Sequence, residues 1–160
     1  MSRHARAPEV SLRTVEDGDL PLFFEWQADE ESFRMAAVPA RDAEAFAAHW
    51  ARIRVNPDSL LRTIVADGAV VGYALSWTGD EGRLVGYWIG KEHWGQGIAS
   101  AALRLYLDVE VHRPLLASVA GHNAGSRRVL EKAGFWLVGE EQVADGPVPG
   151  TFVEQHFRLD

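Results

Sequence analysis

Apolar residues alternate in some stretches of the chain and recur every three to four residues in others, which predicts a mixture of strands and helices. Residues 10–15 alternate and form an expected first strand. Two helices are expected next, one after the turn at residues 17–19 and one after Arg41. In the helix after Arg41, Phe46, Trp50 and Ile53 follow one another at spacings of four and three residues, so they are expected to form its buried side. Residues 29–39, between the helices, show neither pattern and are expected to be irregular.

The middle of the chain predicts three consecutive antiparallel strands. Two apolar runs, residues 60–66 and 69–77, are joined by Asp67-Gly68. This dipeptide between apolar runs is a strong hairpin signal, because a type I′ turn needs positive φ at both central residues. A second turn at residues 79–82 leads into a strand over residues 83–89.

The last part of the chain alternates strands and helices. A helix from about Ile98, a strand over 115–120, a helix from about Ala124 and a strand over 135–143 follow in turn, and residues 151–159 form a last strand. The helix from about Ile98 connects the strands over 83–89 and 115–120, and such a crossover implies that these two strands pair in parallel. The predicted fold is α+β, a mixed and mostly antiparallel sheet of about seven strands flanked by four helices. The crossover helix is expected to bury one face, made of Ile98, Ala102, Leu105 and Val109.

Composition limits the classes of function. The 160 residues suit one domain, residues 1–160, and contain no cysteine, which excludes disulfides and thiolate metal sites. The net charge of −7 argues against general attraction for nucleic acid. No apolar run reaches the roughly 18 residues of a membrane span. Residues 1–9 lack the apolar core of a signal peptide, so a cytoplasmic protein is expected.

Two glycines, Gly95 and Gly97, stand where a strand gives way to a helix. The first turn of a helix has unpaired N–H groups and a partial positive charge, and glycine removes the Cβ that would hold an anion away. Backbone donors for a phosphate would come from Gly95, Gln96, Gly97, Ile98, Ala99 and Ser100. A tight turn without a ligand explains the same spacing.

Three classes of phosphate site compete for this pattern. A P-loop needs Gly-Lys-Ser/Thr, which the chain lacks. A dinucleotide-binding fold needs a third glycine, where this chain has Ser100, and a carboxylate at the end of the next strand, where it has residues 120–123, Ala-Gly-His-Asn. The antiparallel hairpin ahead of the glycines also disagrees with that fold.

The third class is set by two motifs. Tyr87-Trp-Ile-Gly90 followed by Trp94-Gly-Gln-Gly-Ile-Ala99, and Asn123 through Gly134-Phe135, resemble the GNAT acyltransferases, in particular the RimJ/RimL-like branch that acetylates amines. The resemblance runs from about residue 10 to 143. Trp94 stands where many relatives carry Gln or Arg, a departure that leaves the backbone donors intact.

The resemblance implies an acetyl-CoA cosubstrate, with the parallel strand–helix–strand unit as the acyl-CoA-binding element. Its pyrophosphate would lie on the glycine loop and its pantetheine arm in a gap beside Trp88 and Ile89. The implied cofactor-binding residues are Trp88, Ile89, Trp94, Gly95, Gln96, Gly97, Ile98, Ala99, Ser100, Asn123, Ser126 and Arg127. Ser126 matches the general acid of the branch, although helix capping explains Asn123 and Ser126 equally.

The proton acceptor is less well marked. The reaction implied is direct attack of a neutral amine on the thioester in a ternary complex, with a backbone N–H near Ile89 polarising the thioester oxygen. Residues 83–89 contain no carboxylate, although many relatives have one there. His122 is the first candidate for the base and Glu81 the second; an α-amine acceptor could instead use a water relay.

The acceptor is expected to be a small-molecule amine or a protein N-terminus. Trp26 and Arg34 are candidate substrate-binding residues, within loops 26–40 and 145–150 that would surround the acceptor. Histidine spacing predicts no metal site, and no nucleic-acid or membrane partner is expected. The missing strand carboxylate keeps an alternative open, a non-catalytic acyl-CoA-binding module of the same fold. Monomer and homodimer are both compatible with the sequence.

Overall fold

The protein is described here by a computed structural model, which covers residues 6–143 and 151–160. A single sheet in the order β1-β2-β3-β4-β5-β7-β6 forms its centre, and only the β4–β5 pair is parallel. The predicted α+β class and the seven-stranded mixed sheet are confirmed. The strands are β1 Val10–Arg13, β2 Leu60–Ala66, β3 Ala69–Gly79, β4 Gly82–Ile89, β5 Leu115–Ala120, β6 Trp136–Val143 and β7 Phe152–Leu159.

In the part of the chain that the structure describes, five helices flank the sheet, one more than the sequence predicted. They are α1 Leu20–Ala28, α2 Glu30–Ala36, α3 Ala43–Val55, α4 Ile98–Val109 and α5 Ala124–Lys132, with short 3₁₀ turns η1 Asp17–Asp19 and η2 Lys91–His93. Among the described residues, no helix is long and apolar enough to cross a membrane.

The additional helix, α2, lies in the region expected to be irregular. Asp29 starts it, because its carboxylate accepts hydrogen bonds from the Ser32 backbone at 3.0 Å and the Ser32 hydroxyl at 2.8 Å. Glu30 and Glu31 in the first turn favour the helix dipole, and Ala37, at φ 56°, ends the helix. The prediction was wrong because a helix of seven residues has too few apolar positions to show a period.

The hairpin predicted at Asp67-Gly68 is present. Their φ angles are 48° and 83°, both in the left-handed region that a type I′ turn requires. The turn sets the pairing of β2 with β3, from Ala66↔Ala69 to Leu60↔Ser76.

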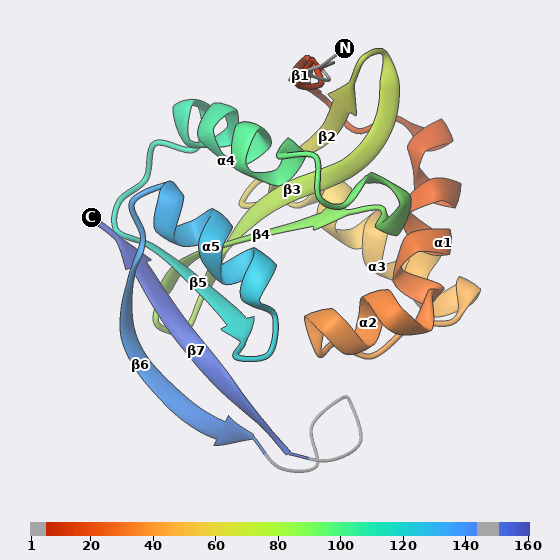
Figure 1. The fold of residues 1–160 in the computed structure, drawn as a ribbon. Coiled ribbons are helices and arrows are strands. Elements are labelled where there is room, and N and C mark those ends of the chain that lie inside the picture. The colour runs from red at the N-terminus through yellow and green to blue at the C-terminus, as the bar shows by residue number, and fades with distance from the viewer. Residues whose placement is uncertain (1–5, 144–150) are drawn as a thin grey trace.

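The helices form two layers, with α4 and α5 on one face of the sheet and α1 to α3 on the other (Figure 1). Each layer encloses its own apolar core, and one centres on Phe23, Trp26, Phe46 and Trp50. The other core contains Ile98, Ala102, Leu103 and Tyr106 of α4. The prediction for α4 was therefore partly wrong. Leu105 and Val109 are 37% and 39% exposed, and Leu103 and Tyr106 take their place.

A buried polar cluster joins α4 to β3 and β4. Glu110, at the end of α4, accepts hydrogen bonds from Ser76 Oγ and Arg83 Nε, both at 2.6 Å. The Ser76 hydroxyl also lies 2.6 Å from the Tyr106 hydroxyl. This cluster lies where β4 begins, at the end where β4 and β5 are paired.

Candidate active site

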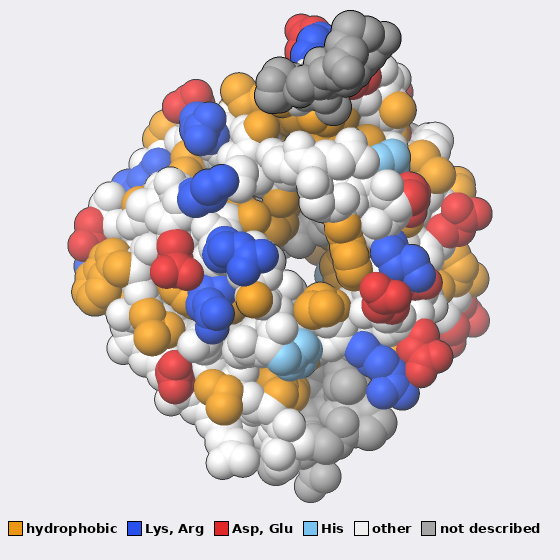
Figure 2. Space-filling view, viewed as in Figure 1, with side chains coloured by type: hydrophobic (Ala, Val, Ile, Leu, Met, Phe, Trp, Pro, Cys, Tyr) orange, Lys and Arg blue, Asp and Glu red, His pale blue; other side chains and the backbone are white. Residues whose placement is uncertain are grey.

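The parallel strands β4 and β5 diverge after a short contact. They pair only at Arg83↔Leu115 and Leu84↔Leu116, near the beginning of each strand. Beyond Leu84 the two strands separate, and a cavity of about 680 Å³ opens beside the second half of β4. Figure 2 shows it as a hollow in the centre of the face that carries α4 and α5.

The cavity brings together most residues predicted to bind the cofactor. α2, β4, η2, the loop before α4, the first turn of α4, the end of β5 and α5 along its length contribute to its wall. The predicted residues in the lining are Trp88, Ile89, Trp94, Gly95, Gly97, Ile98, Ala99, Ser100, Asn123 and Ser126. Gln96 and Arg127 lie outside it, and Arg127 Nε is instead 3.8 Å from Glu131 on the same helix.

The two glycines have a backbone shape that other residues rarely adopt. Gly95 and Gly97 have φ of 78° and 77°. A Cβ added at either would meet no atom within 4 Å, so close packing is not the reason for these glycines. The left-handed backbone requires glycine, and the space in front of the loop remains open to a ligand.

Helix α4 begins at this loop without the usual side-chain cap. Gly97 is the N-cap, no side chain caps the helix, and its first turn contains no acidic residue. The N–H groups of Ile98, Ala99 and Ser100 therefore have no intrahelical acceptor, and they carry the positive end of the dipole of a 12-residue helix. This arrangement suits the pyrophosphate of CoA.

The backbone of Ile89 faces the gap between the strands. Gly90 N donates to Val71 O at 2.9 Å, and Ile89 pairs with Gly72. Because hydrogen-bonded and non-hydrogen-bonded pairs alternate in an antiparallel ladder, the N–H and C=O of Ile89 point away from β3. The carbonyl accepts a hydrogen bond from Trp94 Nε1 at 2.9 Å. The N–H is the group left facing the gap, whereas Trp88 bonds back to β3 by the same alternation.

Ser126 and Asn123 make the capping contact predicted for them. Asn123 Oδ1 accepts a hydrogen bond from Ser126 N at 3.2 Å at the start of α5. The Ser126 hydroxyl is free of this contact and lies 2.7 Å from the hydroxyl of Tyr87, which also donates to the Ser126 carbonyl at 3.1 Å. Capping and a role for the hydroxyl in the cleft are therefore compatible.

Tyr87, the first residue of the Tyr87–Gly90 motif, also lines the cleft, although it is not among the residues predicted to bind the cofactor. It precedes Trp88 on β4, so the two side chains point to opposite faces of the sheet, Tyr87 toward α5 and Trp88 toward the core beneath α1 and α3. Burial raises the pKa of Tyr87 to about 12, so the phenol keeps its proton at neutral pH. Strand alternation was the signal that could have identified it.

His122 lies in the cavity wall, at the end of β5. Its Nε2 is 3.0 Å from the backbone carbonyl of Arg34 at the end of α2. A carbonyl only accepts, so Nε2 carries a proton and Nδ1 is the free acceptor of the neutral ring. The Arg34 side chain is exposed, forms an ion pair with Glu30 at 2.9 Å, and is not part of the wall.

Two other predicted residues lie outside the cavity wall. Glu81 lies in the turn before β4, and the eight residues of that strand place it about 25 Å from Ile89. The structure does not bring Glu81 to the cleft. Trp26 is buried in the core beneath α1, and its Nε1 donates to Glu92 Oε1 at 2.9 Å. The predicted acceptor loop 145–150 lies outside the described residues.

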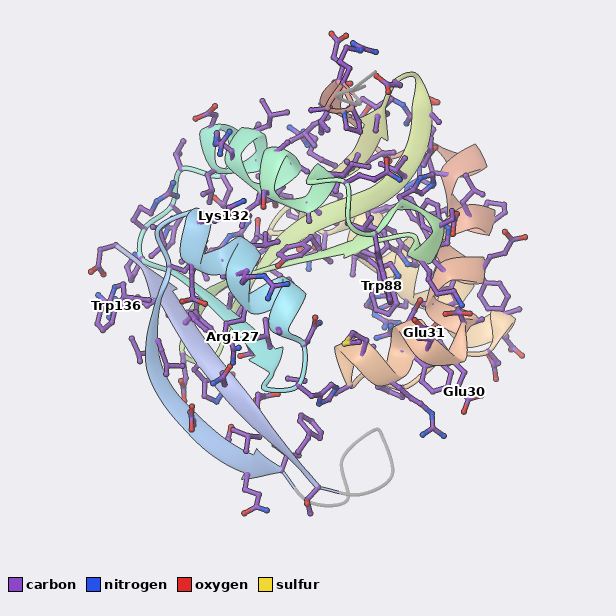
Figure 3. All side chains as sticks on the ribbon, viewed as in Figure 1. Glu30, Glu31, Trp88, Arg127, Lys132 and Trp136 are labelled. Carbon is purple, nitrogen blue, oxygen red and sulfur yellow. The ribbon has the colours of Figure 1, made fainter. Side chains whose placement is uncertain are left out.

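Lys and Arg side chains gather beside the hollow, over α4 and α5 (Figure 2). Arg128 and Lys132 contribute to the cavity wall. Lys132 and Arg104 also border a small adjoining cavity of about 110 Å³ between the two helices. Figure 3 shows Arg127 and Lys132 on α5, across the opening from Trp88 and from Glu31 on α2. In a chain of net charge −7, this is a local site suited to an anion.

The prediction that no metal is bound stays a prediction. Within the described residues, Glu141, Glu154 and His156 place potential ligand atoms within 4.8 Å of one another. They lie on β6 and β7, whereas the cavity wall comes from other elements. His156 already contacts both carboxylates, at 3.0 and 3.6 Å.

Comparison with known proteins identifies the family. A family model described as "Acetyltransferase (GNAT) domain" matches residues 9–136. The chain therefore belongs to the GNAT acetyltransferase family, and the resemblance drawn from the two motifs is confirmed. It is also similar to a curated protein named probable N-acetyltransferase YjcK, from Bacillus subtilis (strain 168), with 47% identity over 59 residues. That match covers 34% of this chain and one third (33%) of the relative's length.

Solved structures share the fold along nearly the whole chain. Spermidine N-acetyltransferase from Vibrio cholerae, in complex with CoA and spermine, matches with a TM-score of 0.82 at 13% identity, over 94% of each chain. A GNAT-family acetyltransferase from Bacillus anthracis matches with a TM-score of 0.77 at 16% identity, over 96% of each chain. At these identities the similarity shows the fold alone.

Proposed function

We propose that this protein is an acetyl-CoA-dependent N-acetyltransferase, in which an amine attacks the thioester directly within a ternary complex. The observation that carries the proposal is the continuous cavity from the open glycine loop to the divergence of β4 and β5. One ligand with a diphosphate at one end and an extended arm at the other fits this shape. The family match and the CoA bound to the V. cholerae relative support acetyl-CoA as this ligand.

The cofactor is held mainly by backbone groups in this proposal. The pyrophosphate accepts hydrogen bonds from N–H groups between Gly95 and Ser100, with Arg128 and Lys132 adding positive charge at the rim. The arm lies against the open edge of β4 and places the thioester oxygen at the N–H of Ile89. Donors fixed where negative charge develops stabilise the transition state most, because they need no reorganisation.

Ser126 donates a hydrogen bond to the departing sulfur, and Tyr87 holds Ser126 in place. A phenol with a pKa of about 12 is a poor net acid for a thiolate of pKa near 8.5. The contact of 2.7 Å between the hydroxyls therefore serves orientation. Tyr87 has one hydroxyl proton, and when that proton turns from the Ser126 carbonyl to Ser126 Oγ, the serine proton is free to point at the sulfur.

The acceptor is an amine, either a small molecule or a protein N-terminus. The V. cholerae relative is named for spermidine, which makes a polyamine one of the compounds to test. The acceptor side of the cavity is formed by Ser32, Met35 and Ala36 of α2 together with Trp88. Two histidines, His93 and His122, also face this space, and imidazole is the side chain best suited to take up a proton near neutral pH.

Thiol release tests the proposal against a non-catalytic acyl-CoA-binding module. The protein is mixed with acetyl-CoA and, in turn, a short peptide with a free N-terminus, a primary alkylamine and spermidine. Calorimetry with CoA is run in parallel. An acetyltransferase binds CoA and releases thiol with at least one amine. A binding module binds CoA and releases none, and absence of CoA binding rejects both.

A further inference from the structure

A second imidazole in the cleft has a carboxylate behind it. The 3₁₀ turn η2 follows β4 and places His93 in the cavity wall. Its Nε2 lies 3.5 Å from Glu92 Oε1. Side chains of consecutive residues usually point in different directions. The contact between His93 and Glu92 therefore depends on the tight η2 turn and on a partner that fixes the Glu92 side chain.

Trp26 is the residue that holds Glu92. Its Nε1 donates to the same oxygen, Glu92 Oε1, at 2.9 Å, and its ring stands edge-on to the His93 ring at a centroid distance of 6.4 Å. Trp26 is only 6% exposed and packs against Phe23, 5.9 Å away, so its position is fixed by the core. A Cβ on Gly90 would lie 2.5 Å from Trp26 Nε1, so only glycine lets this part of the chain approach the indole.

The carboxylate of Glu92 determines which ring nitrogen of neutral His93 carries the proton. The pKa of Glu92 is lowered, first by a hydrogen bond from its own backbone N–H and also by Trp26, against the opposing effect of burial, so Glu92 stays ionised. A lone pair on Nε2 would be repelled by this carboxylate. The neutral ring of His93 therefore carries its proton on Nε2, toward Glu92, and keeps Nδ1 as the acceptor.

We propose that His93, positioned by Glu92 and Trp26, is the general base of the acetyl transfer. The inference rests on the proposed function. The amine nitrogen bonds to the acetyl carbon, the carbon–sulfur bond breaks with its electron pair passing to sulfur, and the amine proton passes to His93 Nδ1. From there the proton leaves to the thiolate or to water. The distance of 3.5 Å between His93 Nε2 and Glu92 Oε1 is an ion-pair contact in the free enzyme, and we expect it to shorten to a hydrogen bond when the substrates bind.

His122 is less suited to this role. Its Nε2 is bound to the Arg34 carbonyl, and its ring stands edge-on to Phe152 at 6.2 Å. Among the described residues, no carboxylate lies within ion-pair distance of its ring, so His122 lacks the positioning partner that His93 has in Glu92. Its contact instead ties α2 to the end of β5.

Paired variants test the assignment. His93→Gln is expected to lower kcat at least 100-fold, because general bases typically contribute 10²- to 10⁴-fold. Glu92→Gln should lower kcat about 10-fold with little change in KM for the amine. Both should bind CoA within about twofold of wild type and unfold at a similar temperature, since a carboxamide fills nearly the same volume. His112→Gln, an exposed histidine in the connection between α4 and β5, is the matched control and should leave kcat unchanged.

Rescue and tautomer measurements complete the test. Imidazole in the medium should restore activity to His93→Ala. In NMR spectra of the wild-type histidine rings, assigned by the signals lost in His93→Gln, His93 should be the Nε2–H tautomer. An Nδ1–H tautomer, or a loss of kcat below threefold for His93→Gln, overturns the inference. If His122→Gln has the larger loss, the base is His122 and the proposed function stands. If wild type releases no thiol with any amine, the proposed function itself fails.

Discussion

Substitution of Gly97 by alanine tests whether the loop before α4 binds the CoA diphosphate. At φ 77° the added Cβ costs about 1–2 kcal/mol of stability, and no further clash arises because no atom lies within 4 Å. Bound CoA would meet this Cβ, and the loss of one backbone hydrogen bond to a charged phosphate costs roughly 1.5–3 kcal/mol. The expected weakening of CoA binding is therefore about 10- to 100-fold.

Gly68 provides a matched control for the strain. It has φ 83°, also has no atom within 4 Å, and lies in the β2–β3 hairpin. Gly68→Ala should lower the melting temperature by about 2–8 °C, as Gly97→Ala does, yet leave the CoA dissociation constant unchanged. Calorimetric titration with CoA and thermal unfolding measure the two effects separately. If Gly97→Ala binds CoA within twofold of wild type, or if Gly68→Ala weakens binding equally, the assignment of the loop is refuted.

Three further outcomes are expected. Ser126→Ala should lower kcat about 10-fold in the thiol-release assay and leave CoA affinity unchanged, whereas parallel losses of stability and affinity would reduce Ser126 to a helix-start residue. Arg128→Gln combined with Lys132→Gln should weaken CoA binding and make it less sensitive to salt in calorimetry, and an unchanged salt dependence would place the anion elsewhere. Burial opposes the charge of Asp19, but hydrogen bonds led by Arg13 outweigh it and lower the pKa from 3.8 to about 2. That shift contributes about 2 kcal/mol to the free energy of unfolding above pH 4, and this contribution is lost as the pH falls toward 2. The free energies of unfolding of wild type and Asp19→Asn, measured by denaturant titration, should therefore converge at low pH.

Local signals were sufficient to predict most of the fold. Asp67-Gly68 is found in the hairpin it predicted, and the parallel β4–β5 pair followed from the crossover through α4. Both features depend on residues close together in the chain or on a rule of connection. Helix α2 could not be found by periodicity, although Asp29 followed by two glutamates and a serine is a helix-start pattern.

Parts of the site depend on contacts between distant residues. The hydroxyls of Tyr87 and Ser126 lie 39 residues apart in the chain, and Trp26 reaches Glu92 across 66 residues. No periodicity or spacing predicts such contacts, because they depend on the packing of helices against the sheet. For Glu81, closeness in the sequence was misleading. It is close to β4 in the sequence, but it precedes the strand, whereas the cleft lies where the strand ends.

The opposite orientations of Tyr87 and Trp88 bear on the order in which the two reactants bind. The gap between β4 and β5 is lined from both sides, by α4 and α5 on one and α2 on the other. For the proposed transfer, we expect the nucleotide to reach the gap from the side of α4 and α5 and the amine from the side of α2. Neither reactant would have to leave before the other arrives, so initial-rate plots should show intersecting lines and each ligand should bind the free enzyme on its own.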